Sequence, residues 1–63
     1  MKVRDFANKI RHANLPYSVG IRRGPKMLEH IADINNLEKS SRYLDKTVDS
    51  ICVYEVLIII SIE

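Results

Sequence analysis

The residue types that could support catalysis stand apart from one another along the chain. His12 and His30 are isolated from each other and from Cys52, the only cysteine, so no zinc motif is present. Asp45 and Asp49 are close in sequence, but a predicted break between a helix and a strand separates them. Cys52 falls in a strand that we expect to be buried, where cysteine behaves as a small hydrophobic residue. The serines have no partners at a triad spacing, and the two glycines form no phosphate-binding loop. We therefore expect no catalytic residue, no metal, no cofactor and no enzymatic activity.

Basic side chains offer a second kind of chemistry, which is binding. Arginine presents a planar fork of donors that fits a carboxylate or a phosphate. The predicted partner-binding residues lie around a Gly-Pro turn and on one helix face: Arg22, Arg23, Lys26, Arg4 and Arg11. The three tyrosines are scattered, so the aromatic platform on which single-stranded nucleic acid stacks is missing. These residues predict contact with an acidic protein surface or a nucleic acid.

Charge is distributed unevenly along the chain. Residues 1–32 carry seven basic and two acidic side chains, whereas residues 33–63 carry three basic and six acidic ones. This asymmetry is typical of a basic face that meets an anionic partner. A second interpretation stays open, in which the two halves form one solvated surface and partly neutralise each other.

The length of 63 residues fits one small domain, residues 1–63, whose core supplies only about 3–5 kcal/mol of net stability. A single cysteine allows no internal disulfide and indicates a reducing, cytoplasmic setting. No apolar segment follows the charged N-terminus, and the C-terminal apolar run is shorter than the roughly 18–20 residues that span a bilayer. We therefore expect a cytoplasmic protein without membrane contact that gains buried area by self-association.

The elements that would position the basic side chains begin with a helix over residues 2–12. Its apolar face repeats at helical spacing and consists of Val3, Phe6, Ala7 and Ile10. Residues 17–22 alternate between apolar and polar side chains, which predicts a half-buried strand followed by a turn. Residues 26–34 are ambiguous, because Pro25 suits the first turn of a helix but the turn also suits a hairpin whose second strand follows. The local pattern alone slightly favours the helix.

The second half of the chain completes a small α+β domain. We predict a short helix over residues 37–44, a strand over residues 48–53, a turn at residues 54–55 and a last strand over residues 57–62. If residues 26–34 form a strand, the order is α-β-β-α-β-β, with an antiparallel sheet and a helix packed on it.

The last strand is apolar on both of its faces. Leu57 and Ile59 point to one side, and Ile58, Ile60 and Ile62 point to the other. A strand with one wet face would alternate apolar and polar residues, so this strand should be covered on both sides. Two short helices can hardly cover both faces of a four-stranded sheet. We therefore predict that these five residues form the core and the contact of a two-fold homodimer.

The succession of motifs resembles a group of very short phage and prophage proteins of Gram-positive bacteria. These proteins open with a VRDF-containing helix, here residues 1–10, and continue with a hairpin that ends near Asp33-Ile34. A YLDK segment then leads into a strand, here residues 43–54, and an aliphatic strand follows. The resemblance implies an origin in a mobile element and the hairpin interpretation of residues 26–34. It carries over no functional residue, but small phage proteins usually bind a component of the host.

We therefore predict a non-enzymatic phage or prophage protein that binds and inhibits a host macromolecule, most specifically an anti-CRISPR-type inhibitor of a defence nuclease. Its partner would be a host protein or ribonucleoprotein, such as a Cas effector. Two other classes stay open: a small nucleic-acid-binding regulator, and a structural phage protein that acts by self-association. The resembling proteins often have an acidic hairpin turn, whereas residues 22–26 here are RRGPK. This departure disfavours an acidic DNA mimic and favours a basic contact surface.

Overall fold

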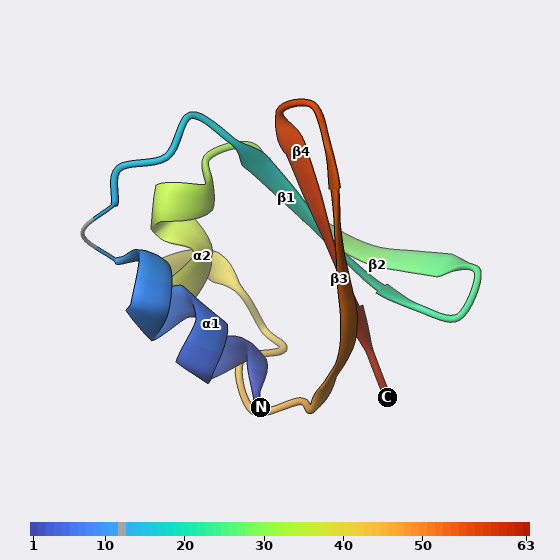
Figure 1. Cartoon of the computed structure of the whole chain (residues 1–63). Helices are drawn as coiled ribbons and strands as arrows, with labels where there is room; N and C mark the ends of the chain where they lie inside the picture. The colour runs from blue at the N-terminus through green and yellow to red at the C-terminus, as the bar shows by residue number, and fades with distance from the viewer. Residues whose placement is uncertain (12) are drawn as a thin grey trace.

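Two short helices lie against one face of a four-stranded sheet in the computed structural model, which describes residues 1–11 and 13–63 (Figure 1). The predicted α+β class is confirmed, and the order of helices and strands matches apart from a short 3-10 helix before the second helix. The elements are, in chain order, α1 (Val3–Ile10), β1 (Ser18–Arg23), β2 (Lys26–Ile31), the 3-10 helix (Ile34–Asn36), α2 (Leu37–Ser40), β3 (Val48–Tyr54) and β4 (Leu57–Ile62).

The sheet is mixed, not antiparallel as predicted, because its two central strands run in the same direction. The strand order is β2-β1-β4-β3, with antiparallel hairpins β1–β2 and β3–β4 and a parallel pairing of β1 with β4. Parallel strands need a long crossover, which here contains α2. Local patterns predict each hairpin but not which strands of the two hairpins meet. This is the physical reason why the prediction of an antiparallel sheet is wrong.

Helix α1 begins where its own Asp5 and the loop before β3 provide hydrogen-bond partners for the backbone N–H groups at the helix start. Asp5 accepts a hydrogen bond from the backbone N–H of Lys2 (2.9 Å), as the acidic residue of a capping box does. The N–H of Arg4 donates to the carbonyl oxygen of Leu44 (2.8 Å), in the loop before β3. The first N–H groups of a helix have no partner within it, so this loop stabilises the start of α1.

Helix α1 ends at Ile10, before the predicted end at residue 12. The N–H of Ala13 donates to the carbonyl oxygen of Ile10 (2.9 Å), and Asn14 adopts a left-handed conformation with φ of 50°. Asparagine tolerates this conformation better than most residues, so the chain can turn here before Pro16. The histidine expected at the end of the helix, His12, lies outside the described residues. No helix within residues 1–11 and 13–63 is long and apolar enough to cross a membrane.

The ambiguous segment after the first strand forms β2, so the hairpin interpretation is confirmed and the helical alternative is wrong. Arg23 pairs with Lys26 across a two-residue turn of Gly24 and Pro25. Gly24 has φ of 57°, a conformation that glycine adopts without strain. A positive φ at the first central position is typical of a type II′ hairpin turn, whose twist matches that of the strands.

Helix α2 was predicted to extend to residue 44, but it ends at Ser40. Glu29 of β2 explains the early end, because its carboxylate accepts hydrogen bonds from the Ser41 hydroxyl (2.7 Å) and from the backbone N–H of Arg42 (3.1 Å). Side-chain bonds to backbone groups compete with those of a helix, and Ser41 is already extended. The contact joins segments far apart in the sequence, so a local pattern does not show it.

The core lies between the helices and one face of the sheet. Its buried side chains come from both helices, the 3-10 helix and three strands: Val3, Ala7, Val19, Ile21, Ile31, Ile34, Leu37, Ile58, Ile60 and Ile62. On β4, every second residue from Ile58 to Ile62 is buried, whereas Leu57 and Ile59 remain partly exposed. The elements of one chain therefore bury only one face of the last strand, as expected from two short helices, and cover of the other face by a second copy stays a prediction.

Strand β3 forms an edge of the sheet, which corrects the expected position of Cys52. The prediction placed this cysteine in a buried strand, but its side chain is only half-buried. The turn after β3 consists of Glu55 and Val56, one residue later than predicted, and Glu55 has φ of 52°. An edge strand has one neighbour only, so Cys52 is covered less than a residue of β4.

Candidate binding surface

The β1–β2 hairpin gathers three of the five predicted binding residues. We call Arg22, Arg23 and Lys26 the hairpin tip. Arg23 and Lys26 are exposed and lie directly opposite each other, and Arg22 precedes them on β1. Figure 1 shows that this hairpin extends beyond the rest of the sheet, on the side away from α1. The tip is therefore accessible to a large partner.

Both arginines of the hairpin tip are anchored at their inner nitrogen. The Nε of Arg22 donates to the Ser61 hydroxyl (2.9 Å) on β4, and this side chain is half-buried. The Nε of Arg23 donates to the main-chain carbonyl oxygen of Glu63 (3.1 Å). The two terminal nitrogens of each guanidinium form no hydrogen bond with residues 1–11 and 13–63, so they remain free for a ligand.

Arg4, which the sequence predicts as a binding residue, forms an ion pair inside the chain. One of its terminal nitrogens lies 2.7 Å from an Asp45 carboxylate oxygen, and both side chains are exposed. This hydrogen bond and the attraction of the two charges lower the pKa of Asp45 and raise that of Arg4. Because exposed pairs of this kind contribute little to stability, Arg4 keeps part of its capacity to bind other groups.

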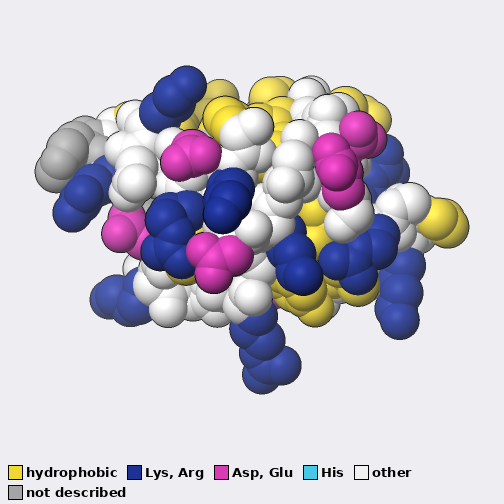
Figure 2. Space-filling model, turned by 90° about the horizontal axis from the view of Figure 1, so that it is seen from below, with side chains coloured by type: hydrophobic (Ala, Val, Ile, Leu, Met, Phe, Trp, Pro, Cys, Tyr) yellow, Lys and Arg dark blue, Asp and Glu magenta, His cyan; other side chains and the backbone are white. Residues whose placement is uncertain are grey.

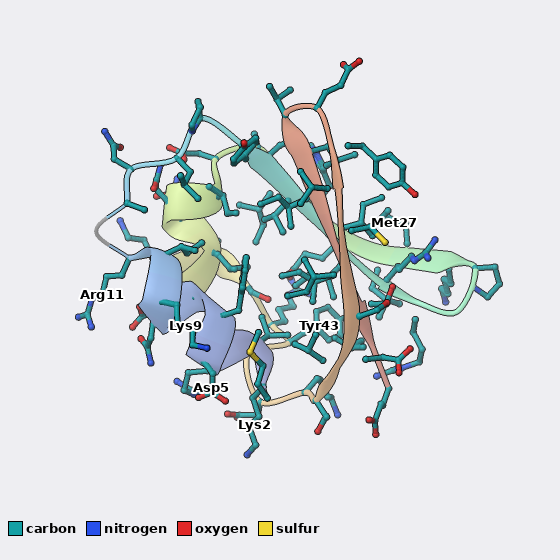
Figure 3. The ribbon with its side chains drawn as sticks, viewed as in Figure 1. Lys2, Asp5, Lys9, Arg11, Met27 and Tyr43 are labelled. Carbon is teal, nitrogen blue, oxygen red and sulfur yellow. The ribbon has the colours of Figure 1, made fainter. Side chains whose placement is uncertain are left out.

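Arg11 follows the last residue of α1 and points away from the molecule (Figure 3). It lies on the helix side of the sheet, far from the hairpin tip (Figures 1 and 3). The structure therefore brings Arg22, Arg23 and Lys26 together but does not bring Arg4 or Arg11 to them.

Basic side chains do not form one continuous patch on the face shown in Figure 2. Lys and Arg side chains are spread over the whole of this view, and Asp and Glu side chains lie between them. The interpretation that the two halves of the chain partly neutralise each other therefore describes this face better than a single basic face does. The hairpin tip is a local cluster of basic charge rather than part of a large positive surface.

A surface that the sequence indicated only through Leu57 and Ile59 of the last strand lies on the side of the sheet opposite the helices. Pairing in register places Gly20 of β1, Ile59 of β4 and Cys52 of β3 side by side, with Leu57 beside Tyr54. Met27 of β2 joins them from the outer edge (Figure 3). We call these six residues the open face. The sequence signal was the apolar pair of Leu57 and Ile59, which pointed to a second apolar side of the last strand.

The residues considered for catalysis do not converge. Asp45 is paired with Arg4, and Ser41 binds Glu29. Within residues 1–11 and 13–63, no three His, Cys, Asp or Glu side chains lie close enough together to hold a metal ion. His30 is exposed on β2.

An open groove of about 580 Å³ lies at the end of the sheet that carries the β3–β4 turn. Asn35 in its wall is satisfied within the chain, because its side-chain amide donates to the carbonyl oxygen of Leu15 (3.0 Å) and to the Asp33 carboxylate (2.9 Å). None of the residues that line it is basic, and none is a histidine or a cysteine. The groove therefore offers fewer groups that could bind a charged ligand than the hairpin tip does.

Comparisons of the chain with known proteins give no further information about this surface. No family model, curated protein or solved structure matches the chain.

Proposed function

We propose that this protein is a non-enzymatic phage or prophage protein that binds and inhibits a host macromolecule in the bacterial cytoplasm through its hairpin tip. Its most specific form is an anti-CRISPR-type inhibitor of a defence nuclease. The supporting observation is the position of Arg23 opposite Lys26 beside an exposed turn. Like charges directly opposite each other destabilise a sheet, so the fold itself does not explain this pair. An anionic partner does explain it.

The anchored arginines of the hairpin tip suit a carboxylate or a phosphate. The contacts of Arg22 with Ser61 and of Arg23 with Glu63 restrain the side chains before a partner arrives. Restraint of this kind lowers the entropy that is lost on binding, and the free terminal nitrogens can form paired, charge-assisted hydrogen bonds. Inhibition would follow from occupation of an acidic protein patch, or of the surface that holds a guide nucleic acid.

A nucleic-acid-binding regulator is a second candidate, which one observation favours. Tyr54 is 59% exposed and lies on the same side of the sheet as Arg22, so a base could stack on its ring while the arginine binds a phosphate. A single exposed ring gives less stacking than the several aromatic side chains of typical single-strand binders. We therefore prefer a protein or ribonucleoprotein partner.

Charge reversal at the two exposed residues of the hairpin tip tests the proposal. We would change Arg23 and Lys26 to Glu together and leave Arg22 in place, because it contacts Ser61 inside the fold. The matched control changes Arg11 and Lys39 to Glu, which alters the net charge equally but on the helix side of the molecule. Circular dichroism spectra of both variants, compared with that of the parent, check that the fold is retained.

The readout is capture of host components from a lysate, followed by a binding measurement with the captured partner and a gel shift with duplex and single-stranded probes at two salt concentrations. We expect the tip variant to lose the partner and the control to retain it. Equal binding by the tip variant would refute a role for this surface. Binding of naked probes that weakens with salt, without a protein partner, would favour the regulator instead.

A further inference from the structure

On the open face, large apolar side chains of β4 lie beside small residues of β1. In the parallel pairing of the two central strands, Leu57 lies beside Ser18, and Ile59 lies beside Gly20. One central strand therefore carries large apolar side chains on this face, and its neighbour carries small residues. Such a surface has a ridge over Leu57 and Ile59 and a furrow over Ser18 and Gly20, whereas at the next pair, Arg22 and Ser61, the larger side chain belongs to β1.

The furrow over Gly20 is covered only by a flexible side chain. A Cβ atom at Gly20 would lie 3.1 Å from the sulfur and 3.2 Å from the terminal carbon of Met27. Met27 is itself 50% exposed and lies on the side of the sheet away from the helices (Figure 3). Methionine adapts its shape to a neighbouring surface more easily than branched residues do, so it can repack when another apolar surface arrives.

The composition of this side of the sheet argues for an apolar occupant. Its two central strands contribute one charged side chain, Arg22, which lies at the hairpin end and already binds Ser61. Among the residues that strand pairing places on this side with Ile59, none is an Asp or Glu, and the polar ones on the outer strands are His30, opposite Gly20, and Ser50, opposite Ser61. A nucleic acid on this face could stack on one aromatic ring only. If a second copy covered the face, the residues paired in register would bury no carboxylate without a partner.

We propose that two copies of this chain stack through their open faces, about a two-fold axis that runs along the strands between β1 and β4. This axis places Ile59 of each copy over Gly20 of the other, and Leu57 over Ser18. Strand directions then agree between the two sheets, as they do within about 30° in aligned sheet packing. The contact uses the same patch twice, which is the commonest form of a symmetric dimer. The same axis places Ser61 of each copy over Arg22 of the other, so the pair covers one of the three residues of the hairpin tip.

The size of the open side indicates how tight the pair is. Four strands about 4.8 Å apart and six residues of about 3.3 Å each span roughly 19 by 20 Å. Two such faces make a flat area of about 760 Å², which side-chain relief raises but which is well below the roughly 1,200 Å² at which stable specific interfaces begin, so the pair is weak. We therefore expect dissociation in the micromolar range and a monomer at high dilution.

Substitution of Ile59 by Lys tests the contact, because this side chain points away from the core. Light scattering of the parent over a rising concentration series should reach twice the chain mass at high micromolar concentration, and Ile59→Lys should remain monomeric with an unchanged circular dichroism spectrum. The matched control is Val56→Lys, which changes an exposed apolar residue of the β3–β4 turn outside the open face. A parent that is still monomeric at the highest concentration, or a lysine variant that dimerises normally, would overturn the proposal.

A milder substitution covers the case in which the lysine variant does not fold. Ile59→Thr keeps a β-branched side chain suited to a strand, and it should raise the dissociation constant at least about tenfold because both copies lose apolar burial. An unchanged constant counts against the stacked pair.

Cys52 distinguishes the stacked pair from a pair joined through the edge strand β3. If two β3 strands paired about Cys52, the two Cβ atoms would lie about 4.5–5.5 Å apart, near the separation that a disulfide bridges. In the stacked pair the two sheets are about 10 Å apart, and the cysteines lie on opposite outer strands. Rapid and complete disulfide formation on mild oxidation would therefore contradict the stacked arrangement, whereas a thiol that stays free in the dimer supports it.

Discussion

Two neighbouring isoleucines of β4 allow the most direct test of which side of the sheet forms the core. Ile60 is 0% exposed and packs beneath the helices, whereas Ile59 points to the open face and is partly exposed. We would change each one separately to Ala. Both substitutions place the same residue in the same central strand, so the lower strand propensity of alanine affects both variants similarly.

The expected free energies differ because the two side chains are buried to different extents. Truncation of a fully buried Ile removes three carbons at about 0.8 kcal/mol each and leaves a cavity, so the free energy of unfolding should fall by between about 2 and 5 kcal/mol. The net stability of a domain this small is only about 3–5 kcal/mol. We therefore expect Ile60→Ala to be largely unfolded, and Ile59→Ala to lose about 1 kcal/mol and stay folded.

Urea denaturation followed by circular dichroism measures both variants, at a protein concentration low enough that light scattering finds monomers. Low concentration matters because a second copy would cover Ile59. The free energy of unfolding that Ile59→Ala loses would then depend on the protein concentration. Equal losses for the two variants, or a larger loss for Ile59→Ala, would refute the assignment of the two sides. The milder Ile60→Val, expected to cost about 1 kcal/mol, gives a measurable midpoint if the alanine variant does not fold.

Two further predictions concern the hairpin turn and the ion pair of α1. Gly24→Ala should lower the free energy of unfolding by about 1 kcal/mol, because alanine is strained at the φ of 57° that Gly24 adopts. A steric clash is not the cause, since an added Cβ atom meets no atom within 4 Å. An unchanged urea midpoint would contradict this prediction. The pKa of Asp45 is lowered by Arg4 in the folded protein, so the pair stabilises the fold above the unfolded pKa and this contribution is lost as the pH falls through the lowered value. The urea midpoints of the parent and Asp45→Asn should therefore differ slightly near neutral pH and converge in acid, and a difference that grows in acid would contradict the assignment.

Several features of the fold follow from short-range patterns. The apolar spacing of residues 3–10 predicted α1, because a helix must bury one face and Val3 and Ala7 lie on it. The alternation of residues 57–62 correctly separated Ile58, Ile60 and Ile62 from Leu57 and Ile59, since side chains of a strand point alternately to its two sides. Both predictions depend only on the geometry of one element.

The features that were predicted wrongly depend on contacts between distant parts of the chain. The end of α2 depends on Glu29, and the parallel pairing of β1 with β4 depends on how two hairpins meet. The candidate site shows the same limit, because Arg4 and Asp45 are 41 residues apart in the sequence. Sequence spacing placed Arg4 and Arg11 on one helix face, but it could not show that this face and the hairpin tip lie on different sides of the sheet.

The stacked pair would also determine how many hairpin tips a partner meets. A two-fold axis along the strands leaves the strand directions unchanged, so the β1–β2 turns of both copies lie at the same end of the pair. Arg23 and Lys26 would then be presented twice, separated by roughly the width of the sheet. A partner with one acidic patch would gain nothing from this arrangement, whereas a partner with repeated or extended anionic surface would bind both tips with higher effective concentration. Ile59→Lys should therefore weaken binding to an extended partner although Ile59 lies outside the tip, and equal binding by monomer and dimer would indicate that one tip is sufficient.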